Sequence, residues 1–142
     1  MSETMEIREE TARPDCVLKP VREGMRRHTE SQAPCGEYSE VTIVARNREG
    51  VVTGVALGEA GRGWLHVSVV WVDEPFRGQG IGRRLMQAAE AAGIGQGCQA
   101  AYLDTFSYQA RPFYEKLGYE VFGTLDDYPP GHQRHFMRKR LQ

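Results

Sequence analysis

A glycine-rich stretch between a predicted strand and a predicted helix has the residue types of an anion-binding loop. It reads Phe-Arg-Gly-Gln-Gly-Ile-Gly-Arg-Arg over residues 76–84. Glycines at alternate positions let the backbone turn sharply and come close to a ligand. The first N–H groups of a helix have no partner inside the helix, and they point at any anion that lies before it. The stretch therefore predicts a local anion site.

Two arginines at the start of the helix support this prediction. Arg83 and Arg84 fall in the first helical turn, where cations oppose the helix dipole and cost stability unless an anion compensates them. Two other phosphate-binding patterns do not fit. A dinucleotide fingerprint that starts at Gly78 requires glycine at position 83, and the Gly-Lys-Ser/Thr of nucleoside triphosphatases does not occur. On the loop alone, glycines that only make a turn remain an alternative.

A second segment, residues 109–119, reads Gln-Ala-Arg-Pro-Phe-Tyr-Glu-Lys-Leu-Gly-Tyr. With residues 77–82 it resembles two motifs of the GCN5-related N-acetyltransferases (GNAT family). These are the acyl-coenzyme A signature Gln/Arg-x-x-Gly-x-Gly/Ala and the later motif Ala-x-x-Phe-Tyr-x-Lys-Leu-Gly-Phe/Tyr. The resemblance covers about residues 41–141. Where the family often has a proline before the first motif and an asparagine before the second, this chain has Glu74 and Ser107.

The resemblance implies a coenzyme A-dependent acyltransferase that moves an acetyl group from acetyl-CoA to a small-molecule or peptide amine. The backbone of the glycine loop would hold the pyrophosphate, and the strand end at residues 70–72 would pair with pantetheine and polarise the thioester carbonyl. Tyr114 would donate a proton to the leaving thiolate, unless it is only a packed aromatic residue. The residues expected at acetyl-CoA are Val70, Trp71, Val72, Arg77, Gly78, Gln79, Gly80, Ile81, Gly82, Arg83, Ser107 and Phe113.

The attacking amine must lose a proton, directly or through water, to a carboxylate or histidine. Glu74 and Asp104 are the expected catalytic carboxylates, and Asp73 and His66 are further candidates. Asp104 lies within an otherwise apolar strand, where an unpaired carboxylate would be costly. A structural role is the simpler explanation for each of these residues alone. Tyr102, Tyr108 and the loop at residues 126–132 are candidates for shaping the acceptor pocket. The alternative is that the aspartates of this loop are only solvated and its prolines only stiffen it.

The elements that must position these residues follow from hydrophobic periodicity and turn residues. Helices are predicted over residues 14–30, 80–92 and 109–116, the second ending in the Gly-Ile-Gly at 93–95. Strands are predicted over residues 41–45, 51–57, 64–72, 99–106, 119–125 and 132–141. The strand at 64–72 is apolar on both faces and is expected at the centre. We therefore predict one α/β domain of the α+β kind over residues 1–142, with a mixed, mainly antiparallel sheet flanked by helices.

Composition limits the remaining possibilities. The 142 residues include 18 basic and 19 acidic side chains, so no global field favours nucleic acid or a membrane as a partner. The start of the chain resembles neither a secretory signal nor an anchor, and three widely spaced cysteines predict neither a metal site nor disulfides. A cytoplasmic protein without a metal is expected. The strand at 132–141 is predicted to be an edge strand, through which a homodimer is one possibility. Two alternatives are a non-catalytic acyl-CoA-binding module and an acetyltransferase of nucleic acid or charged tRNA.

Overall fold

The computed structural model describes residues 3–142, which form two compact units that divide after Gly36. The first unit contains one helix, α1 (Asp15–Gln32), which begins after Pro14. Proline has a fixed φ and no N–H group, so it suits the position just before a helix. The predicted helix at 14–30 is confirmed, and it ends two residues later. None of the described helices is long and apolar enough to cross a membrane.

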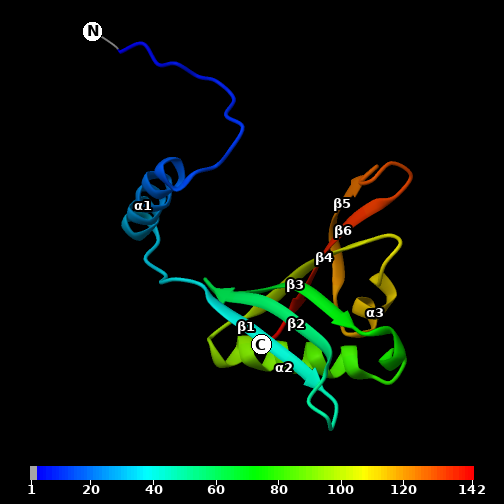
Figure 1. The fold of residues 1–142 in the computed structure, drawn as a ribbon. Coiled ribbons are helices and arrows are strands. Elements are labelled where there is room, and N and C mark those ends of the chain that lie inside the picture. The colour runs from blue at the N-terminus through cyan, green and yellow to red at the C-terminus, as the bar shows by residue number, and fades with distance from the viewer. Residues whose placement is uncertain (1–2) are drawn as a thin grey trace. The chain divides into compact units, whose positions relative to one another are not determined.

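The second unit is built on a six-stranded sheet with the order β1-β2-β3-β4-β6-β5 (Figure 1). The strands are β1 (Ser39–Arg46), β2 (Val52–Gly61), β3 (Trp64–Val72), β4 (Ala100–Phe106), β5 (Glu120–Asp126) and β6 (Gln133–Arg140). Only β3 and β4 run parallel, and all other neighbours are antiparallel. The mixed, mainly antiparallel sheet is confirmed, and so is the central place of β3.

The last strand, β6, lies between β4 and β5, so the prediction that it forms an edge of the sheet was wrong. The loop before it folds β6 back along β5, with Asp126 opposite Gln133. The other side of β6 pairs with the whole length of β4, from Phe106 opposite Arg134 to Ala100 opposite Arg140. Both rows of its backbone groups are therefore used inside the sheet. The edges of the described sheet are β1 and β5.

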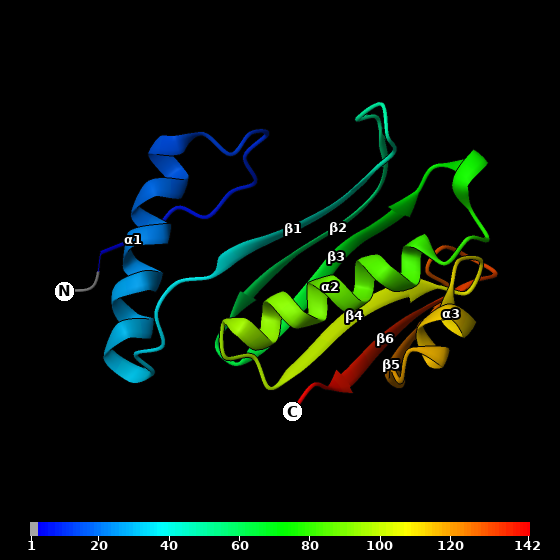
Figure 2. The same cartoon turned by 90° about the horizontal axis from the view of Figure 1, so that it is seen from below.

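Two helices of the second unit lie on the same face of the sheet, as Figure 2 shows. They are α2 (Ile81–Gly95) and α3 (Arg111–Lys116), and a short 3-10 turn, Glu74–Phe76, precedes α2. The inner side of α2 buries Leu85, Met86 and Ala89, which join the core formed with Leu65 and other residues of the sheet. The stripe of apolar residues thus faces the sheet, as the periodicity indicates.

The end of α2 differs from the prediction because Gly93 is needed for packing. A Cβ at residue 93 would lie 3.2 Å from the Cβ of Leu65, so glycine lets the helix approach β3 closely. The helix therefore continues through Gly95. The left-handed residue that terminates such a helix is Gly97, with φ +87°.

The parallel strands β3 and β4 separate after three residues. They pair only from Trp64 opposite Ala100 to His66 opposite Tyr102. Beyond this point β3 continues along β2 while β4 follows β6, and a bulge in β3 at Ser68 shifts its register against β2. Since bulges bend and twist a strand, the carboxyl ends of β3 and β4 diverge. We call this gap the splay.

Candidate active site

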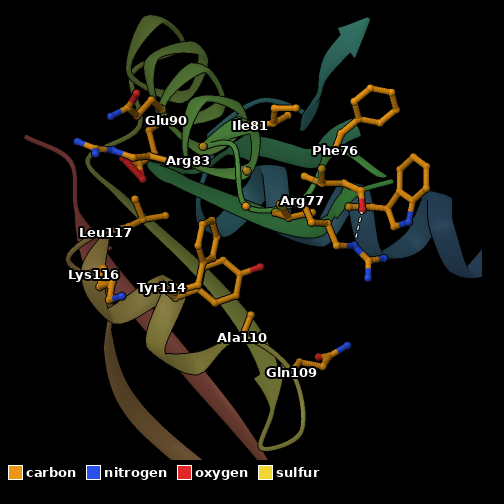
Figure 3. A pocket seen from close by; sticks show the side chains of 18 of the residues that line it. Phe76, Arg77, Ile81, Arg83, Glu90, Gln109, Ala110, Tyr114, Lys116 and Leu117 are labelled. Carbon is orange, nitrogen blue, oxygen red and sulfur yellow. Dashed lines mark hydrogen bonds between the residues drawn. The ribbon is translucent and has the colours of Figure 1, made fainter. Parts of the chain in front are cut away.

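A cavity of about 1090 Å³ lies where the splay meets the start of α2 and the helix α3. It brings together eleven of the residues predicted from the sequence, which are Val70, Trp71, Val72, Arg77, Gly78, Gly80, Ile81, Gly82, Arg83, Phe113 and Tyr114. The predicted donor-site and catalytic residues that do not line it are Glu74, Gln79, Asp104 and Ser107, and the further base candidates Asp73 and His66 do not line it either. The side chains labelled in Figure 3 come from the loop before α2, from α2, and from α3 with the residues that flank it.

The glycines of the loop serve two different purposes. Gly78 and Gly80 have φ of +77° and +79°, and a Cβ at either position would meet no atom within 4 Å. Their backbone is turned into the left-handed region and has open space above it, as an anion-binding loop requires. Gly82 instead permits contact, because a Cβ there would lie 3.3 Å from the Cζ of Phe113.

The start of α2 has no acidic side chain to balance its dipole. Gly80 occupies the N-cap position, which is capped by no side chain, and the first turn contains no carboxylate. The cavity wall carries Arg77, Arg83, Lys116 and Lys139 against the single carboxylate of Glu90. Free N–H groups and an excess of cations together make this cavity suited to an anionic ligand such as a pyrophosphate.

Polar contacts fix the loop between β3 and α2. Arg77 donates from Nε to the carbonyl oxygen of Val72 at 2.9 Å, which ties the loop to the end of β3 (Figure 3). Asp73 accepts a hydrogen bond from the backbone N–H of Glu74 at 3.0 Å and so caps the 3-10 turn. Gln79 reaches back to the carbonyl of Pro75 at 3.5 Å. These side chains hold the shape of the loop.

Tyr114 is buried, and its hydroxyl projects into the cavity (Figure 3). Its ring packs edge-on against Phe113 at 5.0 Å and Tyr119 at 6.0 Å between centroids. Burial, followed by the negative charge of Asp104, raises the pKa of the Tyr114 phenol above its ordinary value. The phenol therefore keeps its proton at neutral pH and is able to donate it.

Asp104 lies on β4 and forms an ion pair with β6. Arg134 donates from Nε to Asp104 Oδ2 at 2.7 Å, and both side chains are about one quarter exposed. The pair offsets the cost that an isolated carboxylate would have within this strand. The negative charge of Asp104 nevertheless contributes to the raised pKa of Tyr114, which lines the cavity.

Two further predicted residues have contacts away from the cavity. His66 stacks on Tyr102 with 4.5 Å between centroids, at the end of β3 where the two parallel strands are still paired. Ser107 accepts from the backbone N–H of Gln133 at 3.0 Å and lies 3.4 Å from the Nδ1 of His132. Ser107 thus joins the turn after β4 to the start of β6.

A part-buried network at the wall of the cavity was not predicted from the sequence. Glu90 accepts hydrogen bonds from the hydroxyl of Tyr119 at 3.0 Å and from the Nζ of Lys139 at 2.7 Å. Burial, followed by the Glu90 charge, raises the pKa of Tyr119. The one available signal was a carboxylate between the buried Met86 and Gly93 on the inner side of α2. The network joins α2 to β6 at the wall of the cavity.

Comparison with known proteins agrees with this arrangement. The family model for the acetyltransferase (GNAT) domain matches residues 38–121. The chain is 38% identical to a blasticidin-S acetyltransferase of Streptomyces morookaense over 68% of this chain and 72% of that protein. It is 36% identical to an acetyltransferase of Agrobacterium fabrum over 72% of this chain and 74% of that protein.

A solved structure is similar over almost the whole chain. The crystal structure of an acetyltransferase from Bacillus cereus has a TM-score of 0.83 and 31% identity, covering 94% of this chain and 97% of that one. The protein belongs to the GNAT family of acetyltransferases. The family match lies inside the second structural unit, and the single domain over residues 1–142 stays a prediction.

Proposed function

We propose that this protein transfers an acetyl group from acetyl-CoA to the primary amine of a small molecule or peptide by direct attack of the amine on the thioester. The observation that carries the proposal is a single cavity whose wall includes the glycine loop, the diverging end of β3 and Tyr114. Membership of an acetyltransferase family supports acyl transfer by a chain with this cavity.

The donor fits the wall of the cavity in two places. The pyrophosphate of acetyl-CoA would accept hydrogen bonds from the N–H groups at the start of α2, beside Arg83. The pantetheine arm would lie in the splay, where the backbone of β3 turns away from β4 and is free to pair as with an added strand. A backbone N–H within residues 70–72 would polarise the thioester carbonyl.

The reaction requires two proton movements. The amine nitrogen forms a bond to the acetyl carbon as the carbon–sulfur bond breaks, and the nitrogen loses a proton. We assign Asp104 or Glu74 to accept that proton, directly or through water. Tyr114 would give its proton to the departing thiolate and recover one from solvent. The negative charge of Asp104 contributes to the raised pKa of Tyr114, and this supports Asp104 over Glu74.

Isothermal titration with acetyl-CoA tests the donor site, with two glutamate variants as a matched pair. Gly80→Glu places a carboxylate where we expect the pyrophosphate. Gly50→Glu makes the same change in the β1–β2 turn, at a glycine with φ +82° that also has no atom within 4 Å. We expect saturable binding that Gly80→Glu abolishes and Gly50→Glu preserves. A folded protein that does not bind acetyl-CoA would overturn the proposal.

Release of free thiol with a panel of amines tests the transfer itself. An amine-dependent release that disappears in Gly80→Glu would support the acetyltransferase. Acetyl-CoA binding without release for any amine would favour a binding module that does not catalyse transfer.

A further inference from the structure

Three aromatic rings gather at the carboxyl end of β4, next to the splay. Phe106 stacks on Tyr108 with 5.3 Å between centroids and 13° between planes, and it lies 5.7 Å from the ring of Tyr128. Tyr108 is 57% exposed and Tyr128 is 45% exposed. We call these three residues the aromatic platform. Exposed, clustered rings of this kind are typical of a surface that binds a ligand.

Arg134 holds the platform in place. It lies directly opposite Phe106 in the pairing of β4 with β6, and its guanidinium carbon is 5.5 Å from that ring. The same carbon is 5.0 Å from the ring of Tyr128, and the guanidinium donates to the Tyr128 hydroxyl at 3.1 Å. Its remaining bond is the ion pair with Asp104. A loop tyrosine is thus fixed by a strand arginine before any ligand binds, which lowers the entropic cost of binding.

The platform lies on the opposite face of the sheet from the donor cavity. The two are nevertheless adjacent at the end of β4. Side chains alternate along β4, and Thr105 contacts the start of α3, where it is an acceptor for the N–H of Ala110 at 3.4 Å. Asp104 and Phe106 must then lie on the opposite face. The N–H of Phe106 donates to Gln109 at 3.1 Å, and Gln109 lines the donor cavity.

This geometry separates the two substrates. If acetyl-CoA fills the helix-covered side of the splay, an amine can reach the thioester only from the other face. Asp104 and the platform lie on that face beside the splay. A ligand that rests on the rings would therefore present its amine near Asp104, whose charge reaches Tyr114.

The charges around the platform indicate the sign of the ligand. Asp104 is paired with Arg134, and two more carboxylates, Asp126 and Asp127, directly precede Tyr128 in the loop. Asp126 and Asp127 are held by hydrogen bonds from Gln133 at 2.7 Å and from the N–H of Gly131 at 3.3 Å. A protonated amine is attracted to this surplus of negative charge.

We propose that the acceptor is a small cationic amine that carries a planar aromatic or heteroaromatic ring, which stacks on Tyr108 and Tyr128 while the amine lies beside Asp104. This inference rests on the proposed function, because the platform is identified as an acceptor site by its position at the donor cavity. Stacking on rigid rings selects a flat ring over a puckered ring of equal size.

Two amines that differ only in the ring test this inference. 2-Phenylethylamine and 2-cyclohexylethylamine have the same carbon skeleton and the same amine, and only the first is planar. Binding of each to the CoA-loaded protein is measured by isothermal titration, and turnover by thiol release. We expect 2-phenylethylamine to bind about two- to twelvefold more tightly, since an aromatic pair adds about 0.5–1.5 kcal/mol beyond area burial. Equal binding of the two amines would overturn the inference.

Three variants locate the effect. Tyr128→Leu should remove the preference, and Tyr128→Phe, which keeps the ring, should retain it. The matched control is Tyr38→Leu, because Tyr38 is 53% exposed and also has a guanidinium carbon, that of Arg62, 5.0 Å from its ring. Tyr38 lines a second cavity with Trp64 and Tyr102. If only the Tyr38→Leu variant lost the preference, the ring of the ligand would bind in this second cavity, and the platform proposal would be refuted.

Binding and turnover separate the two proposals. Selective binding that depends on Tyr128, without thiol release, would support the platform and overturn the transferase. Thiol release at equal rates for both amines would support the transferase and overturn the platform.

Discussion

Gly82 lies directly against the ring of Phe113, where a Cβ would come within 3.3 Å of Phe113 Cζ. The contact joins the glycine loop to the second motif, since Gly82 is in the first turn of α2 and Phe113 is in α3. The two motifs are far apart in the chain, and each shapes the other. The direction in which the first N–H groups of α2 point therefore depends on a ring in α3.

We expect Gly82→Val to weaken acetyl-CoA binding about tenfold, because overpacking of about 1–3 kcal/mol would push the start of α2 away from Phe113. Isothermal titration measures the change. The double variant Gly82→Ala, Phe113→Leu should bind acetyl-CoA more tightly than Gly82→Ala alone, since the smaller leucine side chain makes room for the added Cβ. Undiminished affinity in a folded Gly82→Val protein would contradict the role given to this contact.

Tyr114→Phe should lower kcat about a hundredfold or more, the usual contribution of a positioned acid, while the Kd for acetyl-CoA stays within about twofold. Burial, and then the charge of Asp104, raises the pKa of Tyr114 above its ordinary value of about 10. The wild type should then show no alkaline loss of kcat from this group below about pH 10. An unchanged kcat in Tyr114→Phe would remove the acid assignment.

Asp104→Asn should lower kcat about a hundredfold if this carboxylate accepts the amine proton. The matched control is Glu120→Gln, since Glu120 also pairs with an arginine of β6, at 3.2 Å from Arg138, and is exposed. Rates are compared in variants whose thermal unfolding is two-state. If Glu74→Gln lost activity and Asp104→Asn kept it, the role of base would pass to Glu74.

Stability should fall steeply above about pH 10, because Tyr119 resists ionisation only in the folded state. Burial, followed by the charge of Glu90 and their hydrogen bond, raises its folded-state pKa, so the unfolded chain loses this proton first. The folded state then binds more protons, and the free energy of unfolding decreases as the pH rises. The stabilisation is complete below the unfolded pKa of about 10.

Urea denaturation of wild type and Tyr119→Phe at about pH 8 and about pH 11 measures this effect. Near pH 8 the variant should be about 1 kcal/mol less stable, from the lost hydrogen bond to Glu90. Between the two pH values the variant should lose less stability than wild type. Tyr38→Phe serves as an exposed control, and equal losses in wild type and Tyr119→Phe would exclude Tyr119 as the cause.

Features that depend on neighbouring residues could be predicted from the chain alone. The bounds of β3 were predicted without error, because its apolar run ends at a Gly-Arg-Gly turn on one side and at Asp73 on the other. The glycine loop and the helix after it were equally evident, since glycine conformation and helical periodicity are local properties. These same residues carried the family assignment that the comparisons then established.

Features that join distant residues needed the tertiary structure. The role of Gly93 depends on Leu65 lying beneath it, and only the packed sheet determines that distance. The place of β6 inside the sheet depends on its pairing with β5 on one side and with the side of β4 opposite β3 on the other.

Charge pairs followed the same rule. Asp104 looked like a costly isolated carboxylate until β6 brought Arg134 opposite, and nothing near Glu90 in the chain indicates Tyr119 or Lys139. The sequence by itself determined the loop chemistry and the elements, because backbone sterics and periodicity act between near neighbours. The tertiary structure decided which side chains meet at the splay, because strand register sets contacts between residues that are remote along the chain.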